Sequence, residues 1–149
     1  MDKSLDIIAI GSDHAGVIMK AYLVENMKKS GYKFKDYGPT TDVSMDYPDT
    51  AHPLACAIES GKFQYGILLC GSGNGVAIVA NKYKNIRAAI CWNRELTELA
   101  RKHNDANILV LPARFITPEE ALEFANIFFT TEFEGGRHQR RVEKISQTL

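Results

Sequence analysis

Short apolar runs recur along the chain and are separated by segments in which apolar residues repeat at helical spacing. Runs of this length, bounded by glycine and polar residues, are typical of buried strands. The predicted strands are 7–10, 32–37, 67–69, 87–92 and 108–111. The predicted helices are 17–30, 54–61, 93–103, 117–134 and 137–149, and a further helix is possible after Gly75. Strands that alternate with helices indicate one doubly wound α/β domain with a parallel sheet.

Turn and capping residues set the expected boundaries of these elements. Gly31 ends the first helix, and the Pro-, Thr- and Asp-rich segment 38–53 reads as a long loop. Thr117 to Glu120 has the sequence of a capping box with proline at the first helical position. The glycine pair 135–136 is expected to end the helix that starts at this capping box.

Composition narrows the class of protein. A chain of 149 residues with 45% hydrophobic residues is long enough to bury a core as a single domain. The formal net charge is zero, so nothing in the charge balance favours a nucleic acid or a membrane surface as partner. Cys56, Cys70 and Cys91 are odd in number and widely spaced, so they fit neither a disulfide framework nor a zinc site. The polar start of the chain and the lack of a bilayer-length apolar run predict a cytoplasmic protein.

A thiol followed by a glycine-rich loop stands at the centre of the chain. The strand 67–69 leads into Cys70, and the loop 71–75 has glycine at alternate positions. Strand, glycine loop and helix together let backbone N–H groups converge on an anion, and a cysteine near a helix N-terminus is favoured as thiolate. A buried structural cysteine before an ordinary turn explains the same stretch, so both interpretations stay open here.

The first strand ends in a second candidate loop, 11–16. Its outer glycines have the spacing of a phosphate loop, but Val17 and Ile18 stand where that motif needs lysine and a hydroxyl residue, which excludes a nucleoside triphosphate site. Asp13 and His14 follow the strand end, where ligands bind in such sheets. A helix cap is the other explanation of this polar pair.

Further along, three polar features could act on a ligand. His103 lies on the apolar face of its predicted helix and leads into the polar segment 104–107, so it is either a core histidine or a site residue. Arg137 and Arg141 are four residues apart and project from one helix face, which suits a phosphate monoester or a solvated surface. Tyr47, in the loop, could present a phenol or simply lie on the surface.

Taken together, these motifs strongly resemble the ribose-5-phosphate isomerase type B family, which includes galactose-6-phosphate and allose-6-phosphate isomerases. The resemblance covers nearly the whole chain, in order, and it rests on segments 11–16, 46–48, 70–75, 80–82, 103–107 and 135–138. It implies a Rossmann-like three-layer α/β/α sandwich with a five-stranded, mostly parallel sheet. It also implies an aldose–ketose isomerase without metal or cofactor, in the pentose phosphate pathway. The family forms homodimers, sometimes paired into tetramers, with active sites shared between subunits.

The resemblance also implies a role for each matching residue. Cys70 matches the base that moves a proton between C2 and C1 through an enediolate, Ser72 matches a hydroxyl that assists, and His103 matches the residue that opens the furanose ring, with Asp13 nearby. The remaining matches bind substrate: His14, Tyr47, Gly71, Gly73, Asn74, Gly75, Asn104, Arg114, Arg137 and Arg141. Within the single domain 1–149, segment 135–149 is expected to reach a partner subunit.

One position departs from the family pattern. A branch with the same Gly-Ser-Gly-Asn-Gly loop uses a glutamate directly after the last glycine as base, and here Val76 occupies that position. Because Cys70 is present, the base is assigned to Cys70. Two alternative functions remain: a hexose-6-phosphate isomerase of the same family, and a non-catalytic nucleotide-binding domain. In the latter, Gly71 and Gly73 would begin a dinucleotide fingerprint whose third glycine is missing.

Overall fold

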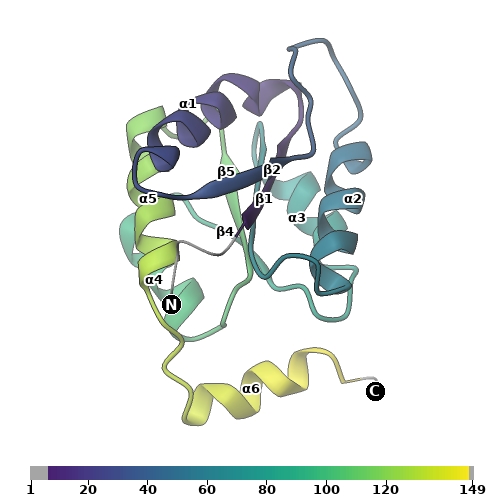
Figure 1. Cartoon of the computed structure of the whole chain (residues 1–149). Coiled ribbons are helices and arrows are strands. Elements are labelled where there is room, and N and C mark those ends of the chain that lie inside the picture. The colour runs from purple at the N-terminus through teal and green to yellow at the C-terminus, as the bar shows by residue number, and fades with distance from the viewer. Residues whose placement is uncertain (1–6, 148–149) are drawn as a thin grey trace.

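A five-stranded sheet forms the centre of the protein (Figure 1). The computed structural model describes residues 7–147. The strands are β1 (Ile7–Ser12), β2 (Lys33–Asp36), β3 (Gly66–Cys70), β4 (Ala88–Ile90) and β5 (Ile108–Pro112). They lie in the order β2-β1-β3-β5-β4, and every neighbouring pair is parallel. The predicted fold class is therefore confirmed, with a sheet that is wholly parallel.

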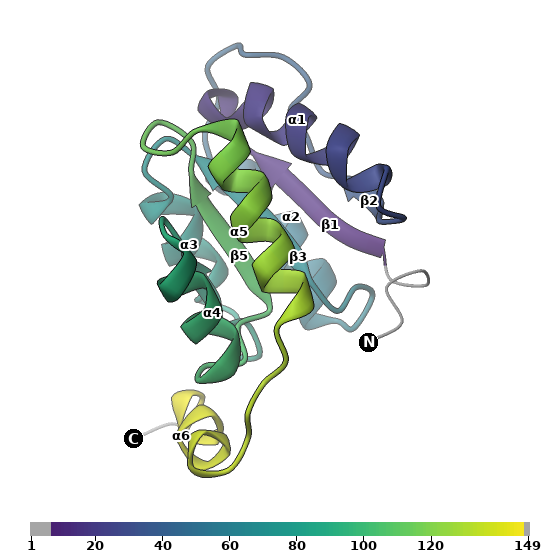
Figure 2. The same cartoon turned by 90° about the vertical axis from the view of Figure 1, so that its left-hand side faces the viewer.

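Helices cover both faces of the sheet, which makes the three layers visible in Figure 2. They are the 3-10 helix η1 (His14–Gly16), then α1 (Val17–Lys28), α2 (Pro48–Glu59), α3 (Asn74–Ala80), α4 (Arg94–Lys102), α5 (Pro118–Thr130) and α6 (Arg137–Ile145). Residues of α1, α4 and α5 share one apolar cluster with the sheet, and residues of α2 and α3 share the other. Within residues 7–147, no helix is both long enough and apolar enough to cross a bilayer.

The central strands are buried on both faces, which explains their continuous apolar runs. In β3, Ile67 and Leu69 pack in the cluster under α1 and α5, whereas Leu68 and Cys70 pack in the cluster under α2 and α3. Side chains of a strand alternate between faces, so the thiol at the end of β3 is fixed on the α2/α3 side of the sheet.

Two predicted helix starts are confirmed in atomic detail. The Thr117 hydroxyl accepts a hydrogen bond from the N–H of Glu120, and the Glu120 carboxylate accepts one from the N–H of Thr117, which completes the capping box. The side chain of Asn93 accepts a bond from the N–H of Leu96 and so caps α4. Each cap satisfies backbone N–H groups that have no partner inside the helix.

Two predicted boundaries were wrong. The helix expected over 54–61 begins at Pro48, because proline is favoured at a first helical position and Pro53, on the exposed side, is accommodated inside α2. The helix expected to run up to the glycine pair ends at Thr130. Gly135 and Gly136 instead have positive φ angles of 68° and 56° and redirect the chain into α6. Leu149, predicted on the last helical stripe, lies outside the described residues.

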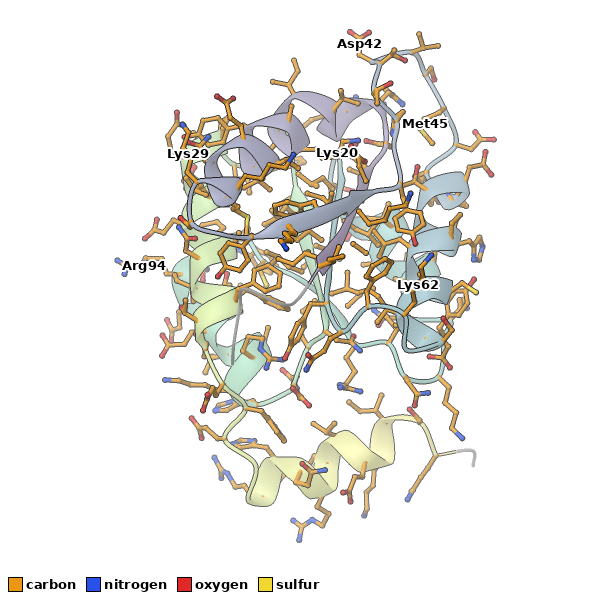
Figure 3. All side chains as sticks on the ribbon, viewed as in Figure 1. Lys20, Lys29, Asp42, Met45, Lys62 and Arg94 are labelled. Atoms are coloured by element: carbon orange, nitrogen blue, oxygen red, sulfur yellow. The ribbon has the colours of Figure 1, made fainter. Side chains whose placement is uncertain are left out.

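A buried lysine holds the start of the long loop after β2. Lys20, labelled on α1 in Figure 3, is 3% exposed. Its ammonium donates to Asp36 Oδ1 at 2.9 Å and to the Pro39 carbonyl at 2.5 Å. An ionised side chain is buried at low cost only when it is paired in this way. The loop that leads to Tyr47 is therefore anchored to α1 at its first residues.

Candidate active site

Three neighbouring strands end at the same edge of the sheet and bring polar groups from distant parts of the chain together. Asp13 follows β1, Cys70 ends β3, and Arg114 follows β5. The Asp13 N–H donates to the Leu69 carbonyl at 3.0 Å, and the Ala113 N–H donates to the Cys70 carbonyl at 2.8 Å. We call the predicted site residues at this edge the carboxyl-edge group: Asp13, His14, Tyr47, Cys70, Ser72 and Arg114, with the loop 71–75.

Cys70 is 5% exposed, and its thiol contacts the glycine loop. The Gly73 N–H donates to Cys70 Sγ, with 3.1 Å between nitrogen and sulfur. Gly73 has a φ of 82°, and a Cβ there would lie 3.1 Å from Val110 Cγ1, so the turn that aims this N–H requires glycine. The loop therefore places a backbone hydrogen-bond donor directly on the sulfur of the predicted base.

Two side chains lie directly against the other glycines of the loop. A Cβ on Gly75 would be 2.6 Å from the ring of Tyr47, and a Cβ on Gly71 would be 3.2 Å from Nη1 of Arg114. The missing side chains thus make room for a phenol and a guanidinium group against the loop that follows the thiol. Both groups suit an anionic, hydroxylated ligand.

Polar side chains at the end of β1 and in the loop have defined hydrogen bonds. His14 Nδ1 accepts a bond from the Met45 N–H at 3.3 Å, so the neutral ring carries its proton on Nε2. Asp13 Oδ1 accepts from the Ala15 N–H at 2.9 Å and therefore acts as a helix cap as well as lying at the site edge. Ser72 Oγ accepts from the Asn74 N–H at 3.2 Å.

The position of the glutamate base in one branch of the resembled family is occupied by Val76, which cannot act as a base. Val76 is fully buried in the cluster between the sheet and helices α2 and α3. Among the other cysteines, Cys91 is fully buried, and burial raises the pKa of its thiol to about 11. Cys56 is exposed on α2. Of the three thiols, Cys70 alone combines a place at the strand ends with an amide donor on its sulfur.

The other predicted site residues lie at the opposite edge of the sheet. Helix α4 starts beyond the carboxyl end of β4 and returns antiparallel to the strands, so it ends with His103 at their amino ends. Helix α6 lies across the same end of the protein (Figure 1). Its Ser146 cap donates to the Lys84 carbonyl, and Gly66, the first residue of β3, donates to the Asn107 carbonyl at 3.0 Å. We call His103, Asn104, Arg137 and Arg141 the amino-edge group.

The two groups are separated by the length of the central strands. Cys70 and Gly66 are the two ends of β3, a span of about 13 Å at the rise of a parallel strand. The buried core fills the space between them. The expectation that Asp13 lies near His103 is therefore not met within one chain, because the helix after β4 carries His103 away from the edge where Asp13 lies.

A second histidine, which the sequence patterns did not connect with His103, packs against it. The rings of His103 and His138 are stacked, with centroids 4.1 Å apart and planes 12° apart. Among the described residues, the ligand atoms of His103, Glu134 and His138 lie within 4.8 Å of one another. Stacked parallel rings direct their nitrogen lone pairs side by side, whereas a metal ion needs lone pairs that converge on one point. The positive charges of Arg137 and Arg141 nearby would also repel a cation. Both the geometry and the charge therefore disfavour a bound cation here. Spacing along the chain could not reveal the contact, because the two histidines are 35 positions apart in the sequence.

A buried arginine organises the turn that follows His103. Arg101 is 4% exposed and donates to Asp105 Oδ1 at 2.9 Å, to the Ala106 carbonyl at 2.6 Å and to the Thr131 carbonyl at 3.1 Å. Asp105 has a φ of 47°, a left-handed conformation that this ion pair helps to hold. The network therefore fixes the backbone on both sides of the His103–Asn104 pair.

Comparison with known proteins places this architecture in one family. The family model described as Ribose/Galactose Isomerase matches residues 8–145. A probable ribose-5-phosphate isomerase B of Mycoplasma pneumoniae is 42% identical over 93% of this chain and 91% of its own. A D-erythrulose-4-phosphate isomerase of Pectobacterium atrosepticum is 45% identical over 93% of this chain and 91% of its own. The crystal structure of ribose-5-phosphate isomerase B from Mycoplasma genitalium with bound ribulose 5-phosphate is 40% identical, with a TM-score of 0.91 over 95% of each chain.

The parallel sheet with a thiol and glycine loop at its carboxyl edge is thus the scaffold of a sugar-phosphate isomerase. The chain belongs to the Ribose/Galactose Isomerase family, which confirms the resemblance drawn from its motifs.

Proposed function

We propose that this protein is an aldose–ketose isomerase that interconverts ribose 5-phosphate and ribulose 5-phosphate, with Cys70 as the base. The observation that carries the proposal is the Cys70 thiol under an amide donor of the glycine loop, at the ligand-binding edge of the sheet. The relatives with this architecture support the substrate class, since one of them is a ribose-5-phosphate isomerase B with ribulose 5-phosphate bound. We further propose that the enzyme works in the cytoplasm, in the pentose phosphate pathway.

The proposed chemistry moves one proton between adjacent carbons. The Cys70 thiolate removes the proton from C2 of the open-chain aldose, and the C–H electron pair forms the C1=C2 double bond of an enediolate while negative charge moves to O1. The thiol then returns the proton to C1 as O2 becomes the ketone oxygen. A proton also passes from O2 to O1, a step that the nearby hydroxyl of Ser72 can mediate. Amide groups of the loop 71–75 stabilise the developing oxyanion.

We propose further that each active site is completed by a second copy of the chain, in a homodimer or a tetramer of such dimers. The distance between the carboxyl-edge and amino-edge groups supports this, because one sugar phosphate cannot contact both groups through the core of the same subunit. In this arrangement, the amino-edge group of one subunit lies close to the Cys70 thiol of the neighbouring subunit. The segment 135–147, with its exposed arginines, provides the phosphate contacts.

His103 is proposed to open the sugar ring before the proton transfer. His103→Asn should slow turnover of ribose 5-phosphate by about 10²-fold or more, the loss typical of a general acid–base group. The same variant should retain exchange of the C1 proton of ribulose 5-phosphate with D₂O, because this ketose has its 5-hydroxyl blocked by phosphate and cannot form a furanose. The exchange is followed by NMR. Equal losses in both assays would assign His103 to the enediolate step or to the structure.

The substrate preference is predicted to favour the pentose. A panel of ribose 5-phosphate, galactose 6-phosphate, allose 6-phosphate and erythrulose 4-phosphate, assayed for kcat/KM, should give the highest value for ribose 5-phosphate. Erythrulose 4-phosphate belongs in the panel because a 45% identical relative is an isomerase of that ketose. A clearly higher kcat/KM for a hexose or tetrose phosphate would reassign the substrate and leave the isomerase class intact. Binding of NAD or ATP without turnover of any sugar phosphate would instead favour the nucleotide-binding alternative.

A further inference from the structure

The orientation of the His103 ring depends on one neighbouring side chain. The backbone of His103 is held by its N–H bond to the Leu99 carbonyl at 2.9 Å. In contrast, no described residue forms a hydrogen bond with its imidazole nitrogens. The contact that defines the plane of the ring is the parallel stack on His138, at 4.1 Å between centroids. A ring held only by its backbone would turn about its side-chain torsions in a half-buried position.

His138 is the better anchored of the two histidines. It lies in the first turn of α6, where its N–H donates to the Gly135 carbonyl at 3.0 Å, and its side chain is 12% exposed. Its Nε2 is 3.8 Å from Glu134 Oε2, and Glu134 is itself tied to α4 by a bond from its N–H to the Lys102 carbonyl at 3.1 Å. The segment that joins α5 to α6 therefore holds the His138 ring in place within the stack.

The charges around the pair keep the supporting ring neutral. Burial lowers the pKa of His138, and His103, Arg137 and Arg141 lower it further, against the opposing effect of Glu134. Lys102 lies on the other side of the segment and is paired with Glu98. Two imidazolium ions stacked face to face would repel each other strongly. A neutral His138 avoids that cost within the stack.

We propose that His138 is a positioning residue: its stacked ring holds the imidazole of His103 in the orientation from which His103 acts on the sugar ring. The inference rests on the proposed ring-opening role of His103. It also assigns a second task to α6, which carries Arg137 and Arg141. Because His138 lies between these arginines in the sequence, the helix that binds the phosphate and the ring that opens the sugar are held as one unit.

The test compares His138→Ala, which removes the stack, with His138→Phe, which keeps a flat ring without any titratable group. His138→Ala should lower kcat for ribose 5-phosphate by about 10-fold or more, the scale of a misplaced catalytic group. It should change C1 proton exchange in ribulose 5-phosphate much less. His138→Phe should restore most of the activity with ribose 5-phosphate. In NMR spectra of labelled enzyme, the ring signals of His103 should shift in His138→Ala and move back in His138→Phe.

Each contrary outcome identifies a different error. If His138→Phe is as impaired as His138→Ala, His138 takes part in chemistry itself and the positioning role is wrong. If His138→Ala lowers both assays equally through a higher KM, the ring merely anchors α6 and its arginines. If His103→Asn shows no difference between the two assays, the proposed ring opening by His103 fails first. A selective loss in His103→Asn, without one in His138→Ala, overturns the positioning proposal alone.

Discussion

Replacing Cys70 by alanine should abolish almost all isomerase activity. The expected loss in kcat is about 10²–10⁴-fold, the contribution of a general base in proton transfer. Alanine removes only the sulfur, and the backbone bonds at the end of β3 do not depend on it, so the protein should fold as before. The activity with ribose 5-phosphate and the far-ultraviolet circular dichroism of the variant are the two measurements. Turnover near that of the wild type would remove the thiol from the mechanism.

Alkylation tests the role of the Cys70 thiol independently, and Cys56 provides a matched control. Iodoacetamide should inactivate the wild type, and ribose 5-phosphate should slow the inactivation. Cys56→Ala removes an exposed thiol on α2, so this variant should be fully active and equally sensitive to the reagent. Buried Cys91, with its raised pKa, should react slowly. If Cys56→Ala resisted inactivation, the alkylated group would lie outside the proposed site.

Activity should return when two inactive variants are assembled together. One carries Cys70→Ala, and the other carries Arg137→Ala with Arg141→Ala, so each homodimer lacks one half of every site. In a mixed dimer, one site combines the intact thiol of one chain with the intact arginines of the other, and the second site carries both defects. Each mixed dimer should therefore have roughly half the activity of a wild-type dimer, by the two-fold symmetry of the assembly.

The experiment is decisive when the mixed species is isolated. Two different affinity tags allow purification of dimers that contain one chain of each kind, after unfolding and refolding of the mixture. Each parent, refolded alone, measures the background, and wild type refolded with the same tags measures recovery. Purified mixed dimers with no more activity than the parents would show that the arginines act within their own chain.

The fold could be predicted from the sequence because its strands are strongly patterned. Buried parallel strands such as β3 and β5 must be apolar on both faces, and the caps at Asn93 and Thr117 use side chains whose local geometry is well defined. The predicted start of α2 lies too late in the chain because Pro48 and Pro53 both resemble loop residues. The packing of Ala51, Leu54 and Ala55 against the sheet, which stabilises that helix, is a tertiary feature that the local pattern does not show.

The sequence patterns single out candidate site residues one by one, but they do not predict how these residues are arranged in space. Cys70 and the loop 71–75 follow a strand directly, so their edge of the sheet can be inferred from the pattern. For His103 the necessary signal was also present: a helix that follows a parallel strand returns to the amino edge, and His103 ends such a helix just before β5. The stack on His138 could not be inferred, because it depends on how the turn at Gly135 and Gly136 places α6.

The exposure of α6 has a thermodynamic consequence for the shared-site arrangement. The helix has nine residues and none of them is buried in the single chain. Helices of this length are marginal in water, so their stability comes from what they dock against. If α6 docks on a second subunit, then ordering of the helix, association of the subunits and capture of the phosphate become linked equilibria. A ligand that binds only the associated form must favour association, so substrate binding would promote assembly of the subunits.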